Sequence, residues 1–300
     1  MKINWSFLAV ASLSLVWATS LSAQAEKIVN PVMAPPKMLL LVHQQFQAGK
    51  AGVRQKLEVA SARAYDRLNV PVSWIDLQSI SGAPEALFFD PLDSFEELDK
   101  DFAVFGQLFA AHPELARMQE EIEALVLSER TTIAVRRDDL GYRASTIDLS
   151  KARFLRMLDV RLHPGREGDF VEAFKVLSAA YEKIASDTPW VVYQINVGLP
   201  SPAFLILVPM SALRQNDDLL DRAQSLREAE GQVGFQRMQQ IAREAYASTE
   251  SALYVISPEM SHVSKEFAAA DPAFWTPKSS ANPIATKPKT SAEPTAKQNP

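Results

Sequence analysis

The spacing of apolar residues changes its period within residues 154–184. Apolar and polar residues alternate before His163-Pro164-Gly165, and after this turn apolar residues recur at helical spacing. The residues at helical spacing are Phe170, Phe174, Leu177, Tyr181 and Ile184. The pattern predicts one strand, one tight turn and one helix.

A weaker copy of this stretch lies 116 positions upstream, in residues 38–68. Glycine, alanine and tyrosine recur in order: Gly49, Gly52, Ala64 and Tyr65 stand opposite Gly165, Gly168, Ala180 and Tyr181. The match continues beyond the helix, where Trp190, Gln194 and Gly198 stand 116 positions after Trp74, Gln78 and Gly82. Such an ordered set of matches indicates an internal repeat.

Each copy is predicted to run strand, helix, strand, strand, helix pair, strand. In the first copy we expect strands over residues 38–46, 70–80, 86–90 and 131–137. The first helix should bury an apolar stripe of Val53, Leu57, Ala60, Ala64 and Leu68. Asp93 or Ser94 should cap the next helix, which should end near His112, and Pro113 should open the last one.

Residues 1–25 have the pattern of a secretory signal, with Lys2, an apolar run and an Ala-Gln-Ala cleavage site. The alternative is a membrane anchor, but polar residues interrupt the run and leave it short for a span. We therefore expect an exported soluble protein, periplasmic or secreted. The expected segments are a signal peptide (1–25), a linker (26–37), a first unit (38–139), a linker (140–152), a second unit (153–258), a docking segment (259–275) and a disordered tail (276–300).

Composition narrows the function classes further. The chain has no cysteine, so the fold must stand without disulfides. Its net charge is −5, which argues against nucleic-acid partners because phosphate binding needs a basic face. After residue 25 no run of 18 or more apolar residues occurs, so we expect no membrane span in the mature chain. We expect a monomer, with a solvated tail rather than a tether at its end.

The opening of the second copy, RLHPGREGDFVEAFK, resembles the start of the dimeric α/β barrel superfamily, which includes NIPSNAP-like and antibiotic-biosynthesis-monooxygenase-like proteins. The first copy departs from this pattern, with Ala48 where Pro164 stands. The resemblance covers residues 38–258 and implies an α+β fold. Two ferredoxin-like (βαββαβ) repeats would pack sheet to sheet as a single-chain pseudo-dimeric α/β barrel, each covering the bare sheet face of the other.

Strand alternation then suggests which side chains face the space between the two sheets. In the second unit these would be Leu155, Met157, Asp159 and Arg161, and in the first Leu39, Leu41, His43 and Gln45. On the second strand of each unit the same face would carry Trp74, Asp76, Gln78 and Ile80, and Trp190, Val192, Gln194 and Asn196. The alternative is a pair of solvated faces with a self-satisfied Asp159–Arg161 pair.

Two function classes remain open. The first is a binding protein for a small apolar or aromatic molecule, with Leu41, Trp74, Met157 and Trp190 as walls and Gln78, Gln194 and Asn196 as orienting groups. The second is the cofactor-independent oxygenase or isomerase that the resemblance implies. In that enzyme His43 or Asp159 would accept a proton and Arg161 would stabilise an oxyanion.

Metal and haem sites have less support. The four histidines, His43, His112, His163 and His262, have none of the spacings of metal motifs, and cysteine ligands are absent. The related haem-binding barrels, which are chlorite dismutase-like and dye-decolourising peroxidase-like, need a proximal histidine, and the GxxDG signature of the latter is missing. Motifs of hydrolases and nucleotide-binding proteins are missing too. We therefore expect no metal and no cofactor.

Overall fold

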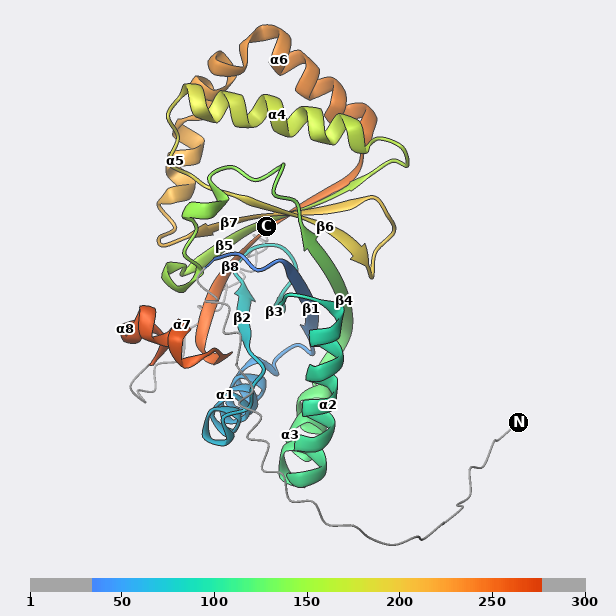
Figure 1. Ribbon diagram of the computed structural model, residues 1–300, viewed down its shortest axis with the longest axis vertical. Helices are drawn as coiled ribbons and strands as arrows, with labels where there is room; N and C mark the ends of the chain where they lie inside the picture. The colour runs from blue at the N-terminus through green and yellow to red at the C-terminus, as the bar shows by residue number, and fades with distance from the viewer. Residues whose placement is uncertain (1–33, 277–300) are drawn as a thin grey trace, which may run out of the picture. The chain divides into compact units, whose positions relative to one another are not determined.

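The computed structural model describes residues 34–276, and Figure 1 shows the order of their elements. The first half contains β1 (Met38–Phe46), α1 (Ala51–Leu68), β2 (Trp74–Ser79), β3 (Glu85–Leu92), α2 (Phe95–Ala111), α3 (Pro113–Glu123) and β4 (Val126–Arg136). After the short helices η1 (Ala144–Thr146) and η2 (Leu149–Lys151), the second half contains β5 (Phe154–Leu162), α4 (Glu167–Lys183), β6 (Val191–Val197), β7 (Ala203–Met210), α5 (Gln215–Asp221), α6 (Ala223–Ala245) and β8 (Tyr246–His262). The chain then forms α7 (Lys265–Ala270) and α8 (Pro272–Trp275). The expected signal peptide and tail lie outside the described residues, apart from Thr276.

The strands close into one antiparallel barrel in the order β1-β3-β2-β8-β5-β7-β6-β4. Each half contributes a four-stranded sheet, and the sheets join where β2 pairs with β8 and β4 pairs with β6. Leu77 lies opposite Ile256 at one seam and Ala134 opposite Ile195 at the other. The predicted α+β barrel fold is confirmed.

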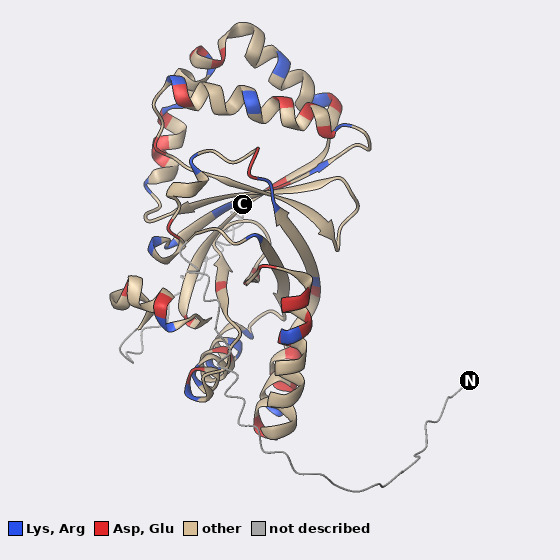
Figure 2. Cartoon of the chain, in the orientation of Figure 1, with Lys and Arg blue, Asp and Glu red and all other residues tan. Residues whose placement is uncertain are grey.

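The inner face of the barrel is largely apolar. Inward side chains from both halves form one cluster, in which Leu41, Leu77 and Leu205 are each 1% exposed. These side chains come from strands far apart in the sequence, so closure of the barrel is what removes them from water. Charged residues are concentrated on the helices instead, as Figure 2 shows.

The outer face of the second sheet is covered by α4, with α6 packed against it (Figure 1). Phe170 of α4 stacks on Phe204 of β7 with 4.2 Å between the ring centroids, and both side chains are fully buried. The predicted helix-facing residues Val160 and Leu162 belong to this outer cluster. The second half is therefore an ordinary sheet–helix sandwich with an apolar interface.

The outer face of the first sheet is more polar, and here the prediction for α1 is only partly right: Ala64 is buried as expected, but the ends of the stripe are not. Val53 and Leu68 of the expected apolar stripe are 50% and 40% exposed, whereas Arg54 and Glu58 are buried. Arg54 reaches across to Asp76 of β2, with 3.0 Å between Nη2 and Oδ2. The sheet presents a carboxylate to the first half of the helix, so Arg54 turns toward it. Ala62, Ala64 and Tyr65 are buried in the second half of the helix.

The remaining boundaries follow local signals. Ser94 caps α2 by accepting a hydrogen bond from the backbone N–H of Glu97, as predicted. Pro113 opens α3 as predicted, but β4 begins at Val126, five residues before the expected strand. Pairing with β1 extends β4 back to this position, a tertiary effect that local spacing does not reveal.

The C-terminal helices α7 and α8 pack against the barrel cluster through Phe267 and Trp275. The indole N–H of Trp275 donates a hydrogen bond to the carbonyl of Ser150 at 2.8 Å. This bond attaches α8 to η2, in the segment between the two halves. Arg153 covers the ring of Phe274 at 3.8 Å from its centroid. Within residues 34–276, no helix is long and apolar enough to cross a membrane.

Candidate active site

Polar residues gather on the inner face where β1 and β5 end. Beyond the buried Leu41, β1 places His43 on the inner face, opposite Arg130 of β4. Beyond Met157, β5 places Asp159 there, opposite Glu250 of β8. The two candidate proton acceptors thus come from opposite sheets and share one end of the barrel.

His43 is held by a carboxylate from the neighbouring strand. Its Nδ1 lies 3.3 Å from Oε1 of Glu85, and the two side chains are 7% and 14% exposed. Tyr254 of β8 donates its hydroxyl to the same oxygen at 2.5 Å. An ionised carboxylate only accepts hydrogen bonds, so the proton of the His43–Glu85 bond sits on Nδ1. The Nε2 atom of a neutral imidazole then carries the lone pair needed by a base.

The charges around Glu85 favour its ionised form. Burial acts to raise the pKa of Glu85, but hydrogen bonds from His43 and Tyr254, with the positive charge of Arg130, outweigh it and lower the pKa. Burial raises the pKa of Tyr254, and its bond to Glu85 adds to that effect. Tyr254 therefore stays a neutral donor and Glu85 an anionic acceptor, which keeps His43 in one tautomer.

The pKa of Asp159 is raised, whereas that of Glu85 is lowered. Burial raises the pKa of Asp159; His43 and Arg130 act against this shift, while Glu250 and Glu85 add to it. A carboxyl group that retains its proton more readily than usual can donate a hydrogen bond or a proton beside a base. The barrel end therefore combines an oriented imidazole with a carboxyl group of raised pKa.

Arg161 lies on the same inner face, one step nearer the barrel end, and is exposed. No hydrogen bond or ion pair among residues 34–276 joins it to His43 or Asp159. The guanidinium that acts on the pKa of Asp159 is that of Arg130, which lies opposite His43 in the β1–β4 register. The structure thus brings together two of the three predicted catalytic residues and leaves Arg161 at the rim.

The expected inward orientation of the two tryptophans is wrong. Trp74 meets Tyr65 of α1 edge-on, with 5.0 Å between the ring centroids, and Trp190 meets Tyr181 of α4 at 4.8 Å. Both indoles therefore lie on the helix-covered face. Each indole N–H also has a carbonyl partner there, Met260 for Trp74 and Leu140 for Trp190. These bonds account for the orientation, because a buried indole N–H needs an acceptor.

The three amide side chains expected to orient a ligand also lie on the outer face, like the tryptophans. Gln78 accepts a hydrogen bond from Arg54 of α1 at 2.7 Å, and Gln194 accepts one from Arg137 at 2.9 Å. Asn196 has the same strand phase and is exposed. Apolar residues occupy both faces of β6, so alternation alone did not determine its phase. The inward residues are Ile75 and Leu77 of β2 and Val191, Tyr193 and Ile195 of β6.

Leu41 and Met157, the other expected wall residues, do face inward. They are 1% and 2% exposed and belong to the interior cluster. Sequence reasoning missed Glu85, Tyr254 and Arg130, which complete the polar end. Glu85 lies opposite Gln45 in the antiparallel β1–β3 register, beside His43, and this pairing between strands separated by α1 and β2 leaves no signal in the sequence.

A metal or haem group does not fit these residues. Among residues 34–276, no group of three or more His, Asp or Glu side chains is arranged to hold a metal ion. A haem bound to His43 would need open space on the inner side of its ring. Leu41, Leu87 and Met157, each at most 2% exposed, belong to the cluster that fills that region.

Comparison with known proteins adds resemblance at the level of fold. No protein-family model matches the chain, and no curated protein matches it. Similar solved structures include an anthrone oxidase-like protein, 16% identical with a TM-score of 0.48, covering 74% of this chain and 92% of that chain. A provisionally assigned monooxygenase from Fusobacterium nucleatum subsp. nucleatum ATCC 25586 is 9% identical with a TM-score of 0.47, covering 74% and 93%. Chlorite dismutase from Candidatus Nitrospira defluvii, in complex with imidazole, is 10% identical with a TM-score of 0.45, covering 76% and 94%. Such values carry no activity across to this chain, so its fold rests on its own strand order and its site on its own side chains.

Proposed function

We propose that the polar end of the barrel is the active site of a cofactor-independent enzyme that removes a proton from a small enolisable substrate with an apolar body. The observation that carries this proposal is the His43–Glu85 pair on the inner face, 3.3 Å apart and largely buried. An imidazole oriented by a carboxylate is an arrangement suited to general-base catalysis. It favours the enzyme over the binding protein, whose expected tryptophan walls lie on the outer face.

In the proposed reaction, Nε2 of His43 accepts a proton from carbon, and the electron pair of the broken C–H bond moves into the substrate as an enolate. Glu85 stabilises the imidazolium that forms, because its negatively charged carboxylate accepts a hydrogen bond from Nδ1–H of His43. The carboxyl group of Asp159, whose pKa burial raises, is placed to donate a hydrogen bond to the enolate oxygen when it carries its proton. Return of the proton to another substrate atom gives an isomer. Alternatively, the enolate carbon forms a C–O bond with dioxygen, and the resulting peroxide anion takes the proton from His43 to give a hydroperoxide.

The position of the site favours a substrate with an apolar body and one polar group. Leu41 and Met157 are the next inward residues below His43 and Asp159 on their strands, and both are buried in the interior cluster. A substrate therefore lies above them at the polar end of the barrel, where His43 and Asp159 suit one carbonyl or hydroxyl group.

Anthrone is a suitable probe because its methylene C–H lies between two rings and opposite a carbonyl, so proton loss yields an aromatic enolate. Proton exchange is measured without oxygen, as loss of the methylene NMR signal in D2O, and dioxygen uptake is measured separately. We expect His43→Gln to slow exchange by about 10²-fold or more and Asp159→Asn by a smaller factor. His112→Gln, at the exposed junction of α2 and α3, is the matched control and should leave exchange unchanged. Equal exchange rates in wild type and His43→Gln would reject the proposal, and binding of anthrone without exchange would point to the binding protein instead.

We also infer export from residues 1–25, which lie outside the described residues. Their charge and apolar pattern supports cleavage after Ala25. The intact mass of protein isolated from its own source measures this directly: a chain that still begins at Met1 would refute the inference.

We further infer that the two halves arose by duplication within the dimeric α/β barrel superfamily, with NIPSNAP-like proteins among its relatives. The support is that Tyr65–Trp74 and Tyr181–Trp190 repeat both the sequence spacing of 116 and an edge-on ring contact. An experimental structure in which the halves superpose without aligning these pairs would contradict it.

A further inference from the structure

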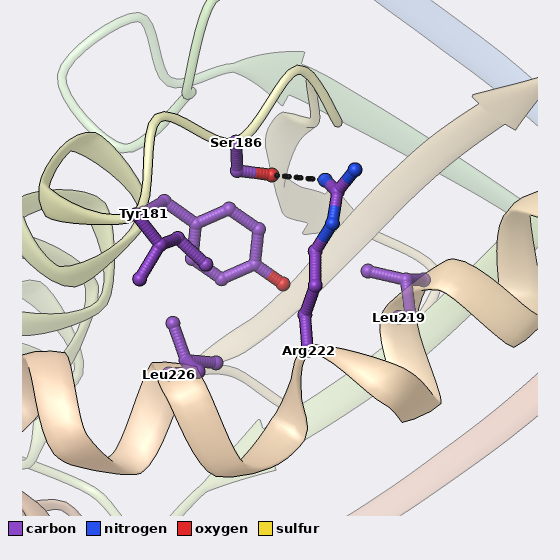
Figure 3. A pocket seen from close by; sticks show the side chains of 6 residues that line it. Tyr181, Ser186, Leu219, Arg222 and Leu226 are labelled. Carbon is purple, nitrogen blue, oxygen red and sulfur yellow. Dashed lines mark hydrogen bonds between the residues drawn. The ribbon is translucent and has the colours of Figure 1, made fainter.

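A small hollow lies on the outer side of the second half, between the end of α4, the loop after it, α5 and the start of α6 (Figure 3). It has about 200 Å³ of empty space, open mouth included. Its lining residues are Tyr181, Ile184, Ser186, Leu219, Arg222 and Leu226. The candidate active site is on the inner face of the barrel, so this hollow is a separate feature.

Arg222 is fixed at one wall of the hollow by a single nitrogen. Its Nη1 donates to Oγ of Ser186 at 3.2 Å and to Oδ1 of Asp187 at 3.0 Å. Ser186 is 1% exposed, so it anchors the guanidinium firmly. Within residues 34–276, neither Nε nor Nη2 of Arg222 has a hydrogen-bond partner. A guanidinium carries five N–H groups, which leaves three to receive an acceptor.

Tyr181 supplies a second donor. Its ring is held edge-on by Trp190 at 4.8 Å and Tyr142 at 5.6 Å between centroids. Figure 3 shows its hydroxyl directed into the space beside Arg222, and no described residue bonds to it. Burial raises the pKa of Tyr181, Arg156 and Arg222 act against this, and Glu230 and Tyr142 add to it, so the hydroxyl keeps its proton. An anion with two oxygens can accept from both groups.

The rest of the lining selects the class of anion. Leu219, Leu226 and Ile184 offer apolar surface beside the two donors. Asp187 at the rim offsets part of the charge of Arg222 and disfavours a polyanion such as phosphate. We propose that the hollow binds a small monocarboxylate with a short apolar body, about the size of acetate. Its carboxylate accepts from Arg222 and Tyr181, and its body lies against the leucines.

The test is an NMR titration of the full chain with acetate, with acetamide as the uncharged match. We expect saturable amide shifts in residues 181–186 and 219–226, a Kd of about millimolar order, and no saturation with acetamide. Arg222→Gln should weaken acetate binding by about tenfold or more, and Tyr181→Phe, which keeps the ring, by a smaller factor.

Arg227→Gln is the control, because Arg227 lies in the first turns of α6, the helix that Arg222 precedes, but contacts Phe235 rather than the hollow. Equal binding by Arg222→Gln and wild type would overturn the proposal, as would shifts that do not saturate or that map elsewhere. If Arg222→Gln does not fold, Tyr181→Phe becomes the deciding variant. An affinity of Tyr181→Phe equal to that of wild type would then overturn the proposal.

Discussion

Tyr254 donates a hydrogen bond to Oε1 of Glu85 from a strand 169 positions further along the chain. The same oxygen accepts from Nδ1 of His43, so one carboxylate oxygen holds two donors. Glu85 belongs to the first half of the chain and Tyr254 to the second. The orientation of His43 is therefore completed only when the two sheets close into one barrel.

Tyr254→Phe tests this arrangement. The variant removes one of the hydrogen bonds that lower the pKa of Glu85, so this pKa should rise. Carboxyl carbon NMR as a function of pH measures the shift. Tyr246→Phe is the control, since Tyr246 lies by the outer cluster and should leave Glu85 unaffected. An unchanged Glu85 titration in Tyr254→Phe would show that the hydroxyl does not act on the carboxylate.

The sequence predicted the candidate site only in part, for a physical reason. Polar residues end an otherwise apolar inner face on β1 and β5, so the alternation placed His43 and Asp159 correctly on that face. Which neighbour each side chain meets depends on the register between strands, and a single strand carries no record of it. Glu85 and Tyr254 were not predicted because the contacts that join them to His43 depend on this register.

The sequence predicted the fold better than it predicted which residues of each strand face the inside of the barrel. Repeated turns and helices predict two βαββαβ halves, and a bare sheet face predicts their closure. On β6, however, Val191 and Val192 suit either face, and the deciding factor is the outer carbonyl that receives the N–H of Trp190. Likewise, the buried face in the first half of α1 follows Asp76, a residue that lies on another element.

Trp190→Phe tests the corrected phase of β6. The variant leaves the carbonyl of Leu140 without the indole N–H that reaches it at 2.9 Å. We expect a loss of about 1–3 kcal/mol in the free energy of unfolding, as for other buried groups left unpaired. Denaturant unfolding measures this loss, and the anthrone exchange rate per folded molecule should not change. A fall in the anthrone exchange rate with an unchanged free energy of unfolding would mean that Trp190 faces the inner site.

Asp90→Asn should stabilise the protein at neutral pH and above. Burial raises the pKa of Asp90 to about 7, with a further contribution from Asp101, and its Oδ1 is buried without a hydrogen-bond partner in the described part of the chain. Because the folded pKa exceeds the unfolded one, folding takes up a proton, and stability falls as pH rises from about 4 to about 7.

The amide in Asp90→Asn cannot ionise, so this loss is removed. The melting temperature of the variant should exceed that of wild type at pH 8, by an amount that shrinks toward pH 4. Asp99→Asn, an exposed change on α2, should show no such pH-dependent gain. A variant less stable than wild type at pH 8 would mean that the Asp90 carboxylate makes a favourable contact.

Gly198→Ala should weaken the seam between β4 and β6. Gly198 has a φ of +99°, and a Cβ there would lie 2.2 Å from the carbonyl oxygen of Thr131. Gly165→Ala is the matched control, since Gly165 has a φ of +79° but no atom within 4 Å of such a Cβ. Both variants bear the cost of a left-handed alanine, about 1–2 kcal/mol. Gly198→Ala adds the clash, about 1–3 kcal/mol more.

The difference between the two alanine variants isolates the contact between Gly198 and β4. Urea unfolding measures the total loss, and amide hydrogen exchange locates it. In Gly198→Ala the amides of residues 131–135 should exchange faster than in Gly165→Ala, because Ile133 lies opposite Val197 next to the substituted position. Equal stability and equal exchange in the two variants would mean that β4 and β6 separate easily, so the barrel seam would not be a tight contact.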